Sequence, residues 1–260
     1  MTTILAAIDD STAAAPVLAV GRAMASLLDA SLEAVHVREG DKQTAVAVAE
    51  RAGVPLRVID GPPPEGIAAA AADAAVRMVV VGARGQPAGP RPAGHVAVAI
   101  AERIDKPVLV VPPDVTVADG ARPIRRVLIP LEGSQESTDA VATSLRDLAA
   151  AGVELVAVHV FDTTTVPRFW GEPGHAEQTW AATFLSRWCT EPGVDLHLRR
   201  GSVPATIVDI AGSDGVDLIA LGWAQDLGPG RAEVVRAVLT HACAPVLLVP
   251  LLSPRGQPQD

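Results

Sequence analysis

The segment VVVGARGQPAGPRPAGHVAVAI, residues 79–100, contains residue types that could bind a phosphate group. An apolar run leads into a connection with four glycines and three prolines, and a second apolar run follows. Glycines let backbone N–H groups approach an anion closely, and a helix start adds the positive end of its dipole. The connection therefore indicates a phosphate-binding loop, with an ordinary surface loop as the alternative.

Two further candidate positions follow apolar runs that are typical of buried strands. Asp9 comes directly after the run ILAAI, and Val37 ends the run AVHV. In an open α/β sheet, ligands bind beyond the carboxyl ends of the strands, so both positions would lie at a ligand-binding edge. Asp9 and Asp10 also precede Ser11 at an expected helix start, where capping of that helix is the alternative role.

The sequence contains one order of segments twice. ILAAIDDS at 4–11 corresponds to VLIPLEGS at 127–134, and AVHV occurs at both 34–37 and 157–160. Farther along, VVVG at 79–82 corresponds to IALG at 219–222, and KPVLVVP at 106–112 corresponds to APVLLVP at 244–250. The second copy also carries an insert at about 161–180. Two similar domains in tandem are therefore expected.

Within each copy, short apolar runs alternate with amphipathic ones. In the first copy, strands are expected at 3–8, 32–37, 55–60, 77–82 and 107–111, and helices at 13–29, 42–52, 64–75 and 95–104. Nearly continuous apolar strands suit a parallel sheet covered on both faces. The sequence predicts an α/β protein with two doubly wound parallel-sheet domains, at 1–115 and 122–252, and a disordered tail at 253–260.

Composition argues against several classes of function. The net charge is −9 and both halves are acidic, so nucleic acid is not an expected partner. The two cysteines, Cys189 and Cys243, suit reduced thiols in the cytoplasm. Neither an export signal nor a membrane span is indicated. The six histidines lack the spacing of metal ligands, so no metal site is expected.

The motifs, in this order and found twice, resemble those of the universal stress protein family. The family pattern has an acidic residue after the first strand, a glycine-rich connection before a helix, and a Pro-Val-Leu-Val last strand. Here ILAAIDDS, GARG, GH and KPVLVVP stand in those places. The resemblance implies Rossmann-like, adenine-nucleotide alpha-hydrolase-like domains related by a pseudo-two-fold axis. It further implies an internal pseudo-dimer, alone or within a homodimer, whose last strands pair with each other.

The resemblance also implies a binding site for ATP or AMP, with or without magnesium, in the first domain. Asp9 would contact the ribose or a phosphate, and the backbone of Val37 would contact the adenine. The residues expected at the phosphates are Gly82, Arg84, Gly85, Gly94 and His95. This loop is one residue shorter than the family pattern, its prolines donate no N–H, and His95 replaces a hydroxyl residue. Arg84 and a protonated His95 could offset the lost donors.

In the second domain the equivalent positions are Glu132, Val160 and Gly222. Gln225 stands where the second glycine of the pattern belongs, and Trp223 is expected to crowd a phosphate path. We therefore expect the second domain to have a degenerate nucleotide site.

All phenylalanines and tryptophans lie after residue 160, at Phe161, Phe169, Trp170, Trp180, Phe184, Trp188 and Trp223. The insert that contains several of them is a candidate surface for a protein partner. The alternative is that the residues at spacing four, from Trp180 to Trp188, form the buried stripe of a helix that replaces the 42–52 helix. His36 and His159, at matching places in the repeated strands, are expected to be core histidines rather than catalytic bases.

The resemblance to the universal stress protein family implies a regulator of the stress response that binds an adenine nucleotide and is not an enzyme, and the composition suits the cytoplasm. Two alternatives stay open. One is an interaction scaffold that binds no nucleotide, because the first loop departs from the pattern. The other is a slow ATP hydrolase, although no nucleophile beside a base and no paired carboxylates with a metal are indicated.

Overall fold

The computed structural model of the chain describes residues 2–11, 13–38, 43–83, 95–113, 115, 123–162, 164–167, 176–189, 191–226 and 232–251. The elements of the first half are β1 (Thr3–Ala7), α1 (Ala14–Leu27), β2 (Ser31–Val37), α2 (Gln43–Ala52), β3 (Leu56–Ile59), α3 (Pro63–Ala71), β4 (Val76–Gly82), α4 (His95–Arg103) and β5 (Val108–Val111). Those of the second half are β6 (Arg126–Pro130), α5 (Gln135–Ala150), β7 (Glu154–Phe161), α6 (Ala176–Trp188), β8 (Asp195–Arg200), α7 (Val203–Ser213), β9 (Leu218–Trp223), α8 (Glu233–His241) and β10 (Val246–Pro250).

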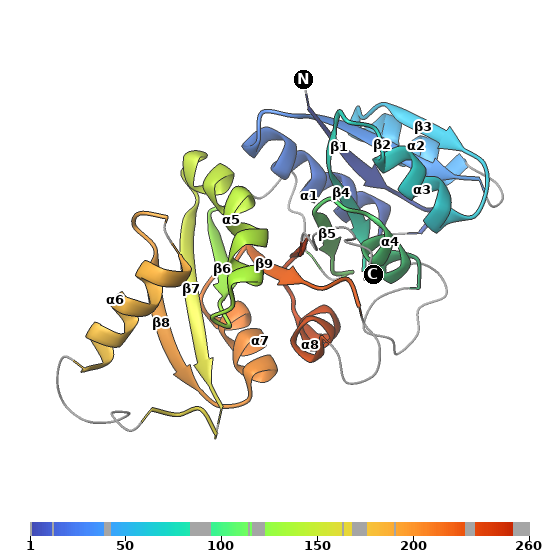
Figure 1. Ribbon diagram of the computed structural model, residues 1–260. Coiled ribbons are helices and arrows are strands. Elements are labelled where there is room, and N and C mark those ends of the chain that lie inside the picture. The colour runs from blue at the N-terminus through green and yellow to red at the C-terminus, as the bar shows by residue number, and fades with distance from the viewer. Residues whose placement is uncertain are drawn as a thin grey trace, which may run out of the picture.

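All of these strands join in one sheet, in the order β3-β2-β1-β4-β5-β10-β9-β6-β7-β8 (Figure 1). Neighbouring strands run parallel within each half, whereas β5 and β10 pair antiparallel, with Leu109 opposite Leu247. From its outer strand inward, each half has its own strands in the order third, second, first, fourth and fifth. The sheet therefore has a pseudo-two-fold relation between its halves, and the predicted pairing of the two last strands occurs within one chain.

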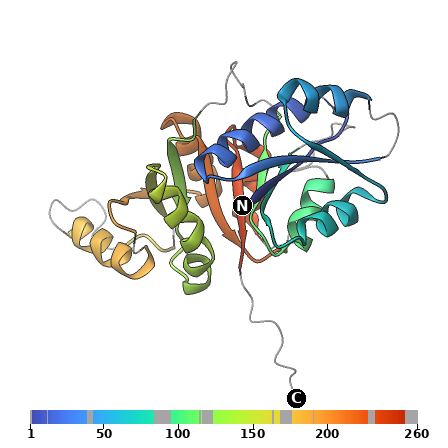
Figure 2. The same ribbon diagram turned by 90° about the horizontal axis from the view of Figure 1, so that it is seen from above.

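The helices cover both faces of the sheet, as the nearly continuous apolar strands predict. Helices α1, α2, α5 and α6 bury one set of strand side chains, and α3, α4, α7 and α8 bury the other. In β1, for example, Ile4 and Ala6 face the first layer, while Leu5 faces the second. Seen from above, the helices of the two halves lie on either side of β5 and β10, and α6 lies farthest from the first half (Figure 2).

The α/β class and the doubly wound order are thus confirmed, and element ends differ from expectation by a few residues. The helix expected at 64–75 is α3, which ends at Ala71. Gly61 and Gly201 have φ values of 112° and 145° in the turns before α3 and α7. The tail predicted at 253–260 lies outside the described residues.

Candidate functional site

Three strand ends of the first half meet at one edge of the sheet. Strand β1 lies between β2 and β4, and its last residue, Ala7, pairs with Val35 on one side and Val81 on the other. Asp9 follows β1, Val37 ends β2, and Gly82 ends β4. The structure therefore brings these three predicted site positions to the carboxyl edge of neighbouring strands, where parallel α/β sheets bind ligands.

Asp9 lies in a turn that its own side chain organises. Its carboxylate accepts hydrogen bonds from the backbone N–H of Ser11, at 3.0 Å, and from the Ser11 hydroxyl. Asp9 is exposed, so its carboxylate stays accessible to solvent beside the strand ends. Helix α1 is preceded by Ala13 and has no side-chain cap, so the alternative expectation that Asp9 and Asp10 cap α1 is wrong.

Asp10 instead reaches a different helix. Its Oδ1 accepts a hydrogen bond from the backbone N–H of Ala45, in the first turn of α2, at 2.9 Å. Helix starts leave N–H groups without partners, and a carboxylate there satisfies one of them and complements the dipole. Asp10 thus ties the turn after β1 to α2, a role that no local pattern indicated because Ala45 lies far along the sequence.

His36, the buried histidine of β2, connects the same elements. Its Nδ1 lies 3.0 Å from the carbonyl oxygen of Ile8, and its Nε2 lies 4.0 Å from Oδ2 of Asp10. With 4% of its surface exposed, His36 is part of the core, as predicted, and has no access to a substrate. Its ring holds the end of β2 against the end of β1.

The last part of the predicted site is the connection from β4 to α4. Arg84, Gly85 and Gly94 lie outside the described residues, as does the side chain of His95. Helix α4 begins at His95, and its apolar residues Ala97 and Ile100 are buried in the core. Packing of these residues therefore fixes the position of α4 in the core.

In the second half, the acidic residue after the first strand turns toward its own helix. Oε1 of Glu132 accepts hydrogen bonds from the hydroxyls of Ser134, at 2.7 Å, and Ser137. Ser134 caps α5, because its hydroxyl oxygen accepts a hydrogen bond from the Ser137 N–H at 3.3 Å. Glu132 therefore stabilises the start of α5.

The first turn of α5 also fills the edge that corresponds to the first-half site. A Cβ added at Gly222, the last glycine of β9, would lie 3.1 Å from the carbonyl oxygen and 3.3 Å from the Cα of Ser137. In addition, β6 pairs with β9 through Val127 and Leu128, whereas β1 pairs with β4 along its whole length. The backbone of Ser137 thus occupies the space beside Gly222.

Aromatic rings fill the neighbouring space beside β7. Phe184 of α6 lies 4.6 Å from the His159 ring and 4.9 Å from Trp180, measured between ring centroids. A Cβ added at Gly133, whose φ is 88°, would lie 3.1 Å from the Phe184 ring. Burial among these groups lowers the pKa of His159, and its 2.7 Å hydrogen bond to the Leu131 carbonyl opposes this only in part.

The buried stripe expected on α6 is therefore present in part. Phe184 is buried, while Trp180 and Trp188 are half-buried and pack against the same core. Phe161 and Val160 at the end of β7 are buried as well. Phe169 and Trp170, the other aromatic residues of the insert, lie outside the described residues.

Trp223, the last residue of β9, and Gln225, just beyond the strand, differ from expectation. Trp223 is 3% exposed and packs in the core on the side of α7 and α8, so its ring points into the protein. Gln225 has a φ of 56°, in the left-handed region that favours glycine. It retains the backbone conformation of a glycine position while carrying a long polar side chain.

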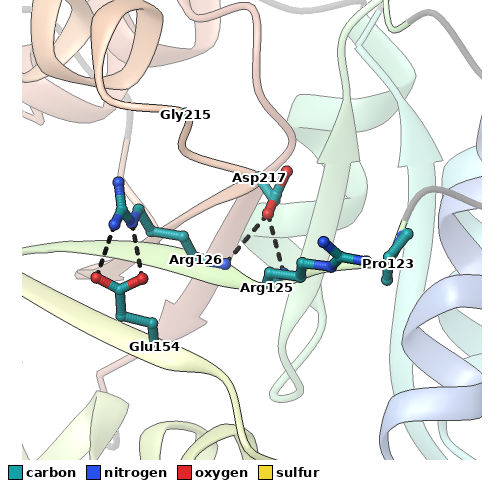
Figure 3. Close-up of a pocket in the computed structure, with 6 residues that line it drawn as sticks. All are labelled: Pro123, Arg125, Arg126, Glu154, Gly215 and Asp217. Carbon is teal, nitrogen blue, oxygen red and sulfur yellow. Dashed lines mark hydrogen bonds and ion pairs between the residues drawn. The ribbon is translucent and has the colours of Figure 1, made fainter.

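A hollow of about 400 Å³ lies at the opposite edge of the sheet, near the amino ends of β6, β7 and β9 (Figure 3). The Arg126 guanidinium donates two hydrogen bonds of 2.9 Å to the Glu154 carboxylate there. Oδ2 of Asp217 accepts from the backbone N–H groups of Arg125, at 2.9 Å, and Arg126, at 3.1 Å. These charges hold strand starts together, away from the predicted site.

The described residues were also compared with the requirements of a metal site and of a membrane span. They contain no group of three or more His, Cys, Asp and Glu side chains placed to hold a metal ion. Their helices also include none with the length and apolar character needed to cross a membrane.

Comparison with known proteins agrees with this architecture. A functionally unknown protein from Pseudomonas aeruginosa PAO1 has a similar fold, with a TM-score of 0.68, 14% identity, and coverage of 96% of this chain and 93% of the other. A universal stress protein from Archaeoglobus fulgidus DSM 4304 gives a TM-score of 0.67 at 15% identity, with coverage of 95% and 98%. At these identities the likeness concerns the fold.

The curated proteins include none whose sequence matches this one. The sequence model of the universal stress protein family, in contrast, matches two successive segments, residues 38–112 and 123–250. These segments contain most of the elements of the two halves that the sheet relates by its pseudo-two-fold order. The chain therefore belongs to the universal stress protein family and carries two of its repeats in tandem.

Proposed function

We propose that this universal stress protein is a regulator that binds one adenine nucleotide, ATP or AMP, in its first half. The observation that carries the proposal is the difference between the two carboxyl edges. In the first half, Asp9 is exposed beside strands that stay paired to their ends. In the second half, Glu132 is exposed as well, but the backbone of Ser137 lies against Gly222 and the ring of Phe184 lies against Gly133.

The proposed contacts follow from this edge. The backbone of Val37 would meet the adenine, and Asp9 would meet the ribose or a phosphate. The phosphates would lie against the start of α4, with contacts to Gly82, Arg84, Gly85, Gly94 and His95. A helix start and nearby cationic side chains favour an anion at this place. Glu132, Val160 and Gly222 would make no equivalent contacts.

Binding rather than turnover is the proposed role. The carboxylate of Asp10 already accepts from the first turn of α2, and that of Asp9 accepts from Ser11. Both carboxylates therefore serve to fix the turn, which suits a rigid binding site. We further propose that the two units span 1–115 and 122–252 and that the protein works in the cytoplasm, in keeping with its free thiols Cys189 and Cys243.

Isothermal titration of the intact protein with ATP and with AMP, each with and without magnesium, tests the proposal. We expect one site per chain. A Gly85→Asp variant adds bulk and negative charge to the proposed cradle and should weaken binding at least about tenfold. Gly212→Asp is the matched control, because a Cβ at Gly212 meets no atom within 4 Å.

A second pair of variants compares the halves directly. Asp9→Asn should weaken nucleotide binding, while Glu132→Gln, at the equivalent place in the second half, should leave the affinity unchanged. Absence of binding by any adenine nucleotide would contradict the proposal. Equal losses in both members of either pair would also contradict it, because the site would then not lie in the first half.

A scaffold that binds a protein partner through α6 is the second candidate. Trp180 and Trp188 are only half-buried, and the Arg187 guanidinium lies 4.6 Å from the centroid of the Trp188 ring. Aromatic and arginine side chains of this kind are typical of interface anchors. A defined complex that Trp188→Ala abolishes, in a protein without nucleotide affinity, would favour the scaffold.

A further inference from the structure

The side chain of Gln225 crosses from the second half to the first. Its amide nitrogen Nε2 donates hydrogen bonds to the carbonyl oxygens of Ala101, at 3.0 Å, and Ile104, at 2.9 Å. Both acceptors lie at the end of α4, more than 120 residues earlier in the chain. One amide group thus contacts two carbonyl groups of a helix in the opposite half.

These carbonyl groups are ones that a helix leaves without partners. The last four C=O groups of an α-helix have no intrahelical donor, and their burial without a hydrogen bond is costly. Ala101 is 2% and Ile104 is 5% exposed, so water has little access to this end of α4. An amide NH₂ carries two hydrogens and can serve two acceptors at once. Gln225 therefore acts as a C-terminal cap that comes from elsewhere in the chain.

The backbone at Gln225 indicates that the side chain itself is needed. Its φ of 56° is one that glycine adopts without strain and that a residue with a Cβ rarely adopts. The corresponding position in the first half of the sequence is a glycine, Gly85. A glycine at 225 would relax this turn but would leave the end of α4 without its donor.

The capped helix is the one that begins at the proposed nucleotide site. Helix α4 spans only His95–Arg103 and is held along its length by Ala97, Ile100 and Ala101 in the core. Because a short helix moves as a rigid unit, a constraint on its last turn also limits the movement of its first turn.

We infer that Gln225 is a positioning residue through which the second half fixes α4, and thereby the helix start that receives the phosphates. The part of this inference that concerns phosphates rests on the proposed function. The second half would then have lost its own nucleotide site and gained a structural role in the site of the first half.

Removal of the Gln225 side chain should leave the fold intact, because other contacts join the two halves. Strands β5 and β10 pair through buried residues such as Leu109 and Leu247, and Arg77 forms an ion pair with Asp147 of α5. Effects of substitution at Gln225 can therefore be measured in a folded chain.

Hydrogen exchange of the full-length protein, followed by mass spectrometry, tests the contact without any nucleotide. In Gln225→Ala we expect the amides of α4 to exchange about tenfold faster, as the loss of two hydrogen bonds predicts. Gln225→Gly should show the same increase although its backbone is relaxed. The control is Gln135→Ala, because Gln135 donates a hydrogen bond within α5, to Asp139. Unchanged exchange in α4 would overturn the inference.

Nucleotide affinity and rescue then test the positioning role. Gln225→Ala should weaken ATP binding about three- to tenfold, and Gln225→Lys, which supplies donors and a charge suited to a helix end, should recover most of the loss. Faster exchange with unchanged affinity would overturn the positioning role. A wild-type chain that binds no adenine nucleotide would overturn the proposed function, and the exchange rates would still decide whether Gln225 holds α4.

Discussion

The turn after β1 and the turn after β6 occupy equivalent places, yet they use their acidic residues differently. In the first half, Asp9 accepts hydrogen bonds from Ser11, and Asp10 reaches across to α2. In the second half, Glu132 turns back to Ser134 and Ser137 at the start of its own helix. The two turns therefore share the hydrogen bond from the acidic residue to the serine that follows, and they differ in the second contact, which reaches α2 in the first half and Ser137 of α5 in the second.

The closure in the second half needs few residues. Gly222 allows the backbone of Ser137 to approach β9, and Gly133 allows the Phe184 ring to approach the turn after β6. Both approaches depend on the absence of a Cβ. The following predictions test whether these contacts, rather than the fold itself, make the halves different.

The largest effect is expected at Phe184, the buried residue at the centre of the aromatic cluster. Phe184→Ala should lower the free energy of unfolding by about 3 kcal/mol, because it removes a buried ring and leaves a cavity. Urea denaturation measures this change. Thr183→Ala, at an exposed position of the same helix, should change stability by less than about 0.5 kcal/mol. Equal effects would mean that α6 does not pack as described.

Gly222→Ala tests the approach of α5 to β9. The new methyl group would press on the backbone of Ser137, which cannot move as freely as a side chain, so we expect destabilisation by about 1–3 kcal/mol. The control Gly212→Ala lies in α7 with open space around it and should stabilise the protein by up to about 1 kcal/mol. Thermal unfolding distinguishes the two, and a neutral Gly222→Ala would show that the edge is not closed.

Asp10 caps the start of α2 and Ser134 caps the start of α5, and substitutions at each position test these contacts. Asp10→Ala removes the acceptor for α2, and Ser134→Ala removes the acceptor for α5; each should cost about 1 kcal/mol of stability. Asp10→Asn keeps an acceptor oxygen and should cost less. Hydrogen exchange should place the loss in α2 for Asp10 and in α5 for Ser134. A loss spread evenly over both helices would argue against separate caps.

The smallest effect concerns pH and His159. Burial lowers its pKa in the folded state, so between the unfolded value of about 6.5 and the folded value the unfolded chain binds more protons. Its contribution to stability is therefore complete above about pH 6.5 and is lost as the pH falls through this window. Unfolding curves of His159→Gln should show a weaker dependence on pH than those of the control His241→Gln. An identical dependence of stability on pH in both variants would contradict the lowered pKa of His159 in the folded protein.

Local patterns in the sequence predicted most of the fold, because apolar periodicity and repeated segments report directly on strands and helices. They also predicted that Trp180, Phe184 and Trp188 would face one side of a helix. What the patterns missed are contacts between distant residues. Asp10 bonds to Ala45, and nothing near Asp10 in the sequence identifies α2 as its partner.

The same limit applies to the candidate site. Its positions at the ends of β1, β2 and β4 follow from strand order, so they could be inferred. The closure at Gly222 depends on Ser137, and the cap on α4 depends on Gln225, which the sequence marked only as a departure from a glycine pattern. Such contacts become visible only when the strands and helices are placed in space.

The antiparallel pairing of β5 with β10 has a consequence for any attempt to produce one half alone. Val108, Leu109, Val110 and Val111 are each at most 2% exposed, and β10 pairs with the edge of β5 that the first half would otherwise leave free. Without its partner strand, the first half would present this apolar edge and its unpaired backbone groups to solvent, which invites aggregation or pairing with another copy. Each half therefore protects the edge strand of the other from solvent. We expect either half expressed alone to aggregate, and the two halves produced as separate chains in the same cell to remain soluble.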